Sequence, residues 1–130
     1  MRYAWHAMTR PLSHPGVASL TLPCILHALS DPVRLAIVRE LLGCERGLSC
    51  TEAARRLKLA IPKSTGSHHY RVLREAGLIV SERHGTELTS RVRTEELEAR
   101  YPGLLRSILE ADARDLRDRA GRRRALRRAS

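Results

Sequence analysis

The stretch KSTGSHHYRVLREAGLI, residues 63–79, decides the fold. At about 100° per residue, Ser64, Ser67, His68 and Arg71 share one face of a helix, and Leu73 lies opposite with other apolar or small residues. A solvated helix face usually mixes Glu and Lys. This face instead carries hydroxyl, imidazole and guanidinium groups, which donate hydrogen bonds to phosphates and base edges. The pattern favours a helix that faces nucleic acid over the plainer interpretation, the solvated face of an ordinary helical domain.

The segments on either side of this helix give it a structural context. Ser49-x-x-Glu52 is a capping box that predicts a short helix over 50–58, and residues 59–62 form the turn to the helix 63–76. After Gly77 the apolar period falls toward two, which predicts a β-hairpin with a glycine-bearing turn. A helix-turn-helix followed by a hairpin is therefore expected.

Two helices are predicted before this motif and one long helical region after it. Leu22 to Leu29 shows helical spacing, and Asp31-Pro32 is a cap and first position for a helix that Gly43 would close in a left-handed turn. From Thr94 the chain is helical again, with a break at Pro102-Gly103 and helix expected to about Ala120. The fold class is mainly α with a small β-hairpin.

Charge and patterning divide the 130 residues into three parts: a flexible arm (1–20), the folded domain (21–110) and an Arg-rich extension (111–130). The formal net charge is +10, and the extension holds eight arginines against three aspartates. This balance favours a polyanionic partner, although RNA or an acidic lipid surface would satisfy it as well as DNA. For the extension alone, extra non-specific affinity and a simple solubilising role are both open.

The remaining composition points to a cytoplasmic protein that is not an enzyme. No long apolar run suggests export or a membrane span, and an odd set of three cysteines, Cys24, Cys44 and Cys50, suits a reducing compartment. The sequence has no nucleophile elbow, phosphate-binding glycine loop or His-Glu metal motif. We expect no cofactor.

Four segments in order, ALSDPVRLAIVRELL (28–42), LSCTEAARRL (48–57), PKSTGSHHYRVLREAGLI (62–79) and RHGTE (83–87), resemble the ArsR family of bacterial winged-helix regulators. The resemblance covers roughly residues 22–110. It implies a homodimer that binds a double-stranded DNA operator, most simply as a repressor. The helix 63–76 would enter the major groove, the wing would approach the backbone or minor groove, and the first and last helices would form the dimer interface.

The predicted functional residues follow from the helix face and from the resemblance. We expect Ser64, Ser67, His68 and Arg71 to contact the bases. The complete predicted DNA-binding set is Lys63, Ser64, Thr65, Ser67, His68, Arg71, Arg74, Arg83, His84, Gly85 and Thr86. The dimer interface is predicted to use two exposed apolar stripes, formed by Leu22, Ile25, Leu26, Leu29, Leu104, Leu105, Ile108 and Leu109.

The metal motif of the family is missing. Ser49 and Thr51 occupy the positions where that motif carries two cysteines, and residues 94–118 contain no histidine, so no metal site is predicted. The cysteines are most simply small buried hydrophobes, and the alternative is a thiol-based redox or metal sensor that uses Cys24, Cys44 or Cys50.

Two other classes of function stay open. An RNA-binding winged helix would normally stack bases on aromatic residues, and this chain has few: Tyr3, Trp5, Tyr70 and Tyr101. A protein-interaction module with an acidic partner is the second alternative.

Overall fold

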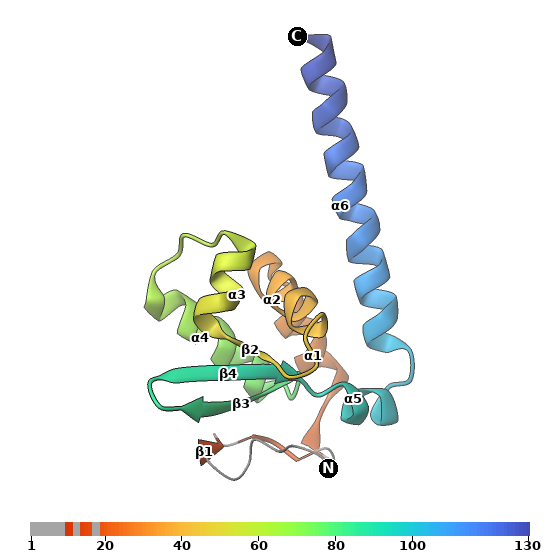
Figure 1. The fold of residues 1–130 in the computed structure, drawn as a ribbon. Coiled ribbons are helices and arrows are strands. Elements are labelled where there is room, and N and C mark those ends of the chain that lie inside the picture. Colours follow the sequence, from red (N-terminus) through yellow and green to blue (C-terminus); the bar gives the residue numbers. More distant parts are fainter. Residues whose placement is uncertain (1–9, 12–13, 17–18) are drawn as a thin grey trace. The chain divides into compact units, whose positions relative to one another are not determined.

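The computed structural model describes residues 10–11, 14–16 and 19–130, which belong to two compact units, Met1–Thr94 and Glu95–Ser130. In the first unit, helices α2, α3 and α4 lie on one face of the β3–β4 hairpin (Figure 1). The predicted class, mainly helical with a small β-hairpin, is confirmed. The elements of the first unit are β1 (Arg10–Pro11), α1 (Leu22–Leu29), α2 (Pro32–Leu42), β2 (Leu48–Ser49), α3 (Cys50–Leu57), α4 (Lys63–Glu75), β3 (Ile79–His84) and β4 (Glu87–Val92).

Helices α1 and α2 begin where the sequence predicts. Asp31 caps α2: its Oδ2 accepts hydrogen bonds from the amides of Val33 at 2.9 Å and Arg34 at 3.1 Å. Gly43 does not adopt the predicted left-handed conformation, because α2 ends with ordinary right-handed geometry at φ −74°. The apolar faces of the helices and the hairpin form one core, made by Ile25, Ala28, Leu29, Ile37, Val38, Leu41, Leu73, Leu78 and Ile79.

The helix-turn-helix consists of α3 and α4. The Ser49 side chain accepts from the Glu52 amide at 3.1 Å, which is the N-cap half of the predicted capping box, whereas the Glu52 carboxylate accepts from Arg55 and Arg56. Lys58, at φ 54°, ends α3 in a left-handed turn that the sequence did not signal. On α4, the side that carries His69, Tyr70 and Leu73 is buried, so the predicted division of this helix into two faces is confirmed.

The sheet has the strand order β1-β3-β4-β2, and all its pairings are antiparallel. Strands β3 and β4 are joined by Gly85-Thr86, and Gly85 takes the positive φ of 64° that such a short turn needs. Inside the hairpin, the hydroxyls of Ser81 and Ser90 are fully buried and 2.7 Å apart. The predicted wing is therefore present.

Part of the N-terminal segment lies against this hairpin, a contact that the prediction of a flexible arm did not include. Arg10–Pro11 pair with β3, His14 Nε2 accepts from the Ser81 amide at 2.9 Å, and Leu20 packs in the core beside Gly77. The rest of the predicted arm, residues 1–9, 12–13 and 17–18, lies outside the described residues.

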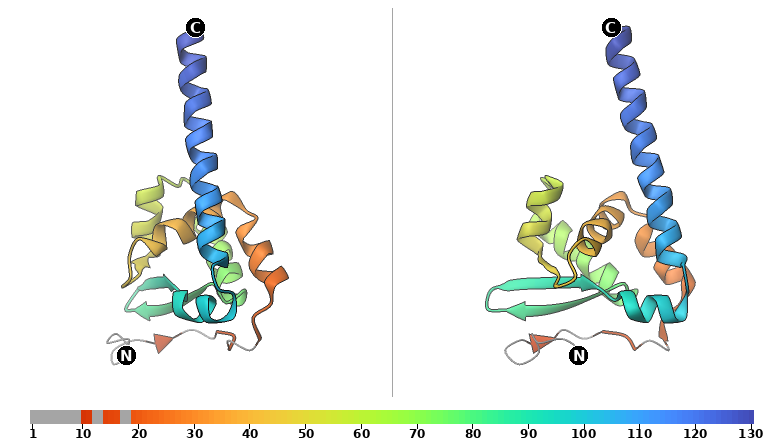
Figure 2. Two further views of the ribbon diagram at one scale, coloured as in Figure 1. Left: turned by 90° about the vertical axis from the view of Figure 1, so that its right-hand side faces the viewer. Right: turned by 45° about the vertical axis from the view of Figure 1, so that its right-hand side comes forward.

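The second unit contains α6 (Leu104–Ala129) and most of α5 (Thr94–Arg100). The predicted break is confirmed: Gly103 has φ 79° and precedes α6. Helix α6 then runs without interruption to Ala129, beyond the predicted end near Ala120 (Figure 2). No helix among the described residues is long and apolar enough to cross a membrane.

The predicted apolar stripe on α1 needs a correction. Ile25 and Leu29 are buried in the core, whereas Leu22 and Leu26 are 38% and 46% exposed. The helix is short and apolar on most sides, so spacing alone could not identify its outer face. Leu104, Leu105, Ile108 and Leu109 on α6 are partly exposed.

Candidate nucleic-acid interface

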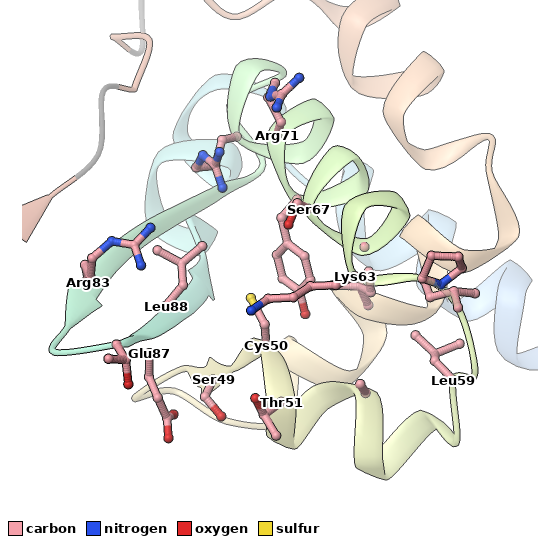
Figure 3. Close-up of a pocket in the computed structure, with 18 residues that line it drawn as sticks. Ser49, Cys50, Thr51, Leu59, Lys63, Ser67, Arg71, Arg83, Glu87 and Leu88 are labelled. Atoms are coloured by element: carbon pink, nitrogen blue, oxygen red, sulfur yellow. The ribbon is translucent and has the colours of Figure 1, made fainter.

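A groove of about 640 Å³ lies between the start of α3, one side of α4 and the β3–β4 hairpin (Figure 3). Apolar side chains such as Leu59 and Leu88 line it at opposite ends, together with cationic and hydroxyl groups. The groove is lined by Ile37, Ser49, Cys50, Thr51, Ala54, Leu59, Ile61, Pro62, Lys63, Gly66, Ser67, Tyr70, Arg71, Arg74, Arg83, Thr86, Glu87 and Leu88.

The groove brings together about half of the predicted DNA-binding residues. These are Lys63, Ser67, Arg71 and Arg74 from α4, with Arg83 and Thr86 from the wing. The others are outside the lining: Ser64, Thr65, His68 and Gly85 are exposed and His84 is half-buried. Ser64 and His68 lie about 60° to 100° around α4 from Ser67, on the flank away from the wing. The predicted set therefore occupies the groove wall and the adjacent outer face of α4.

The arginines of the groove are Arg71, Arg74 and Arg83. Among the described residues, no hydrogen bond or ion pair holds the guanidinium of Arg71, Arg74 or Arg83. Burial lowers the pKa of Arg74, and the charges of Arg71 and Arg83 act in the same direction. Three cations are thus held near one another, with Glu75 and Glu87 as acidic neighbours but no ion pair to either within the described part of the chain, an arrangement that an incoming anion would stabilise.

Cys50 and Tyr70 occupy the inner part of the groove. Burial raises the pKa of the Cys50 thiol, which hydrogen bonds to the Tyr70 side chain, so the thiol is protonated at neutral pH. Burial likewise raises the pKa of Tyr70. Because only 6% of Tyr70 is exposed, its ring cannot serve as a platform for stacking bases.

Behind α4, a buried polar cluster connects the recognition helix to α1 and α2. The Arg34 guanidinium donates from Nε to the Ala28 carbonyl at 2.7 Å and from NH2 to the His27 carbonyl at 3.4 Å. Its NH1 lies 3.2 Å from His69 Nδ1, on the buried side of α4. One side chain therefore joins the last turn of α1 to the middle of α4 and fixes the back of the helix whose front forms the groove.

Sequence reasoning missed several residues of this site. Leu88 enters the groove because the hairpin folds back beside α3, and Cys50 meets Tyr70 because α3 and α4 come together; no local pattern encodes either contact. Arg34 had no signal either, since an arginine within an amphipathic helix normally indicates a solvent-facing position. Ser49 alone had a usable signal, its capping box, which placed it at the start of α3.

The cysteines and other metal-binding side chains do not gather at one place. Cys24, Cys44 and Cys50 are free thiols, and Cys44 Sγ instead accepts from Arg56 NH1 at 3.2 Å. Within residues 10–11, 14–16 and 19–130, no three His, Cys, Asp or Glu side chains are close enough to hold a metal ion.

A helix-turn-helix with an outward polar face, followed at once by an antiparallel hairpin, defines the winged helix-turn-helix class. Comparison with known proteins agrees. Residues 29–82 match a family described as a helix-turn-helix domain. The chain is 37% identical over 84 residues to an uncharacterized HTH-type transcriptional regulator, YceK of Bacillus subtilis, covering 65% of this chain and 82% of that protein.

Two solved structures are also similar. An ArsR-like transcriptional regulator from Rhodococcus sp. RHA1 is 28% identical, with a TM-score of 0.52 over 76% of this chain and 90% of that one. Reduced HlyU from Vibrio cholerae is 28% identical, with a TM-score of 0.49 over 61% of this chain and 86% of that one. The chain belongs to the ArsR-like family of winged helix-turn-helix transcriptional regulators.

Proposed function

We propose that this regulator is a homodimeric, cytoplasmic repressor that binds a DNA operator through α4 and the wing and has no enzymatic activity. Arg71, with Ser64, Ser67 and His68, reads base edges, whereas Lys63, Arg74, Arg83 and Thr86 contact phosphates. Repression follows because a protein bound across the operator blocks other proteins from the same DNA.

The observation that carries this proposal is the set of unpartnered cations along the groove. Arg34, Arg55 and Arg56 each bind an acceptor within the fold, whereas Arg71, Arg74 and Arg83 have none in the part of the chain that the structure describes. Positive charge without an internal acceptor, on a helix and wing of this class, fits a phosphate backbone. Arg71 is exposed near the middle of α4, and one bidentate contact with guanine contributes about 1–3 kcal/mol to discrimination between bases.

The homodimer is supported by apolar surface that a single protomer leaves uncovered. Leu22 and Leu26 are exposed on α1, and Leu116 is 39% exposed on α6. A second copy that covered these side chains would supply apolar burial that so small a domain lacks. Light scattering on the eluting protein should give twice the protomer mass, and Leu22→Ser with Leu26→Ser should shift that mass toward the monomer.

DNA binding is tested on duplexes selected from a random pool, with a scrambled duplex as reference. Fluorescence anisotropy should show tighter binding to the selected duplex. Arg71→Gln should reduce that preference by roughly 5- to 150-fold, the equivalent of 1–3 kcal/mol. Arg46→Gln is the matched control, because it removes an exposed charge outside the groove. An unchanged preference in the Arg71 variant would exclude base reading by this face.

The same assay separates the two other classes of function. Tighter binding to single-stranded RNA than to any duplex would support the RNA alternative, which the burial of Tyr70 disfavours. Binding confined to an acidic protein, with no affinity for either duplex, would support the protein-interaction alternative. The sensor alternative predicts that replacing Cys24, Cys44 and Cys50 with serine abolishes a response to oxidant or metal.

A further inference from the structure

The last part of α6 is a helical segment of unusual charge. From Arg119 to Ala129 it contains six arginines and no acidic residue, and every residue except Gly121 is exposed. The preceding part of the same helix differs, because it carries Asp112, Asp115 and Asp118 as well as its apolar residues. Helix α6 is thus divided along its length, and its end has no counter-charge of its own.

The arginines of this segment cover about 240° of the helix circumference, with Arg122 at one edge, and leave one narrow side without charge. At about 100° per residue, Arg119, Arg123 and Arg127 form one row and Arg124 and Arg128 form a second row beside it. The opposite side carries the small residues Gly121, Ala125 and Ala129. Like charges at i and i+4 weaken a helix by a few tenths of a kcal/mol per pair, about 0.2–0.5, and anions along the rows would relieve that repulsion.

The chemistry of the segment selects among polyanions. A helix that lies on an anionic membrane needs a broad apolar face, and Leu126 is the only large apolar residue between Arg119 and Ala129. Base-specific RNA binding would need aromatic side chains, and this segment has none. Two parallel rows of guanidinium groups instead match the regularly spaced phosphates of duplex DNA.

We propose that residues 119–129 of α6 form a second duplex-binding element, which contacts phosphates and reads no bases. The inference rests on the proposed function, because operator binding by α4 brings DNA to the same molecule and raises the local concentration of phosphates. The element increases affinity for all duplexes alike and leaves the choice of operator to the groove.

The test uses the full-length chain with Arg119, Arg122, Arg123, Arg124, Arg127 and Arg128 all changed to Gln. Glutamine has a similar helix propensity and removes only the charge. The matched control changes the same six residues to Lys. Binding to the selected and scrambled duplexes, each extended by several helical turns, is measured across a salt series, and light scattering verifies that the oligomeric state is unchanged.

The Gln variant should bind both duplexes on the order of tenfold more weakly, and the slope of log K against log salt should fall by about 3 if three phosphate contacts are lost. The Lys variant should retain most of the affinity and most of the salt slope of the wild type. Circular dichroism should give the Gln variant and the wild type the same helix content, so that a loss of affinity reflects the lost charge.

Several results would overturn the proposal. An unchanged affinity and slope in the Gln variant would show that the segment does not touch DNA. A loss of affinity for phosphatidylglycerol vesicles alone would assign the segment to lipid. If the Gln variant lost affinity for the selected duplex only, the segment would read bases. Equal binding of selected and scrambled duplexes by the wild type would refute the proposed function, while the salt slopes would still decide the role of the tail.

Discussion

Arg34 should contribute more to stability than its position on a surface-type helix suggests. It is 8% exposed, and its guanidinium contacts the last carbonyls of α1 and the ring of His69 on α4. Replacing Arg34 with Met keeps the aliphatic stem and removes every donor. The acceptors on Ala28 and His69 would then be buried without partners.

The structure sets the size of this effect. Two of the contacts are within 3.2 Å, and a hydrogen bond to a charged group contributes about 1.5–3 kcal/mol. The third, at 3.4 Å to His27, is long and adds little. The variant also avoids the cost of desolvating the guanidinium, so we expect a net loss of about 2–4 kcal/mol. For a domain of this size that corresponds to a fall in Tm of roughly 10–20 °C.

Urea denaturation followed by circular dichroism measures the free energy of unfolding directly. Arg34→Lys should recover less than half of the loss, because one ammonium cannot reach carbonyls of α1 and the His69 ring together. Arg46→Met is the control for removing an exposed arginine. If Arg34→Met unfolds within about 0.5 kcal/mol of the wild type, the cluster does not link α1 to α4 energetically and the reasoning is wrong.

Three further predictions concern the turn, the cap and the hairpin. Gly77→Ala should lower the free energy of unfolding by about 2–4 kcal/mol, measured by thermal denaturation, because φ is +84° and the new Cβ would lie 1.9 Å from Leu20 Cδ2. Adding Leu20→Ala should relieve the clash but not the backbone strain. The pKa of Asp31 is lowered: burial opposes the shift, but amide hydrogen bonds and nearby positive groups outweigh it. The cap therefore stabilises the fold above pH 3.8, the usual pKa, and loses this contribution as pH falls further; Asp31→Asn should flatten that acid limb of a stability–pH curve. Ser81→Ala should destabilise by about 1–3 kcal/mol because it leaves the Ser90 hydroxyl without its partner, and a double-mutant cycle should show that Ser90→Ala then costs less than it does alone.

The parts of the fold that local sequence determines were predictable, and the parts that depend on distant contacts were not. Asp31-Pro32 and the Ser49 capping box encode helix starts within a few residues, so α2 and α3 begin where expected. The pairing of Arg10–Pro11 with β3 joins segments about 70 residues apart and had no local signal. For helix α1 the sequence predicted the helix but not its buried side. Its apolar residues surround most of the helix, so their spacing does not distinguish the buried side from the exposed one.

The charge of the chain illustrates the same limit. A net charge of +10 predicted a polyanionic partner but could not locate its binding surface, because composition counts every arginine equally. The structure separates the arginines into two groups. Arg34 and Arg56 are held by internal acceptors and stabilise helix contacts, whereas Arg71, Arg74 and Arg83 line the groove with no acceptor from the described ranges 10–11, 14–16 and 19–130. Counterion release depends on the second kind, because a guanidinium held by groups of the fold is less able to neutralise a DNA phosphate and displace its condensed counterions. A salt titration of binding should therefore respond to the groove and to the end of α6, and hardly at all to the paired arginines.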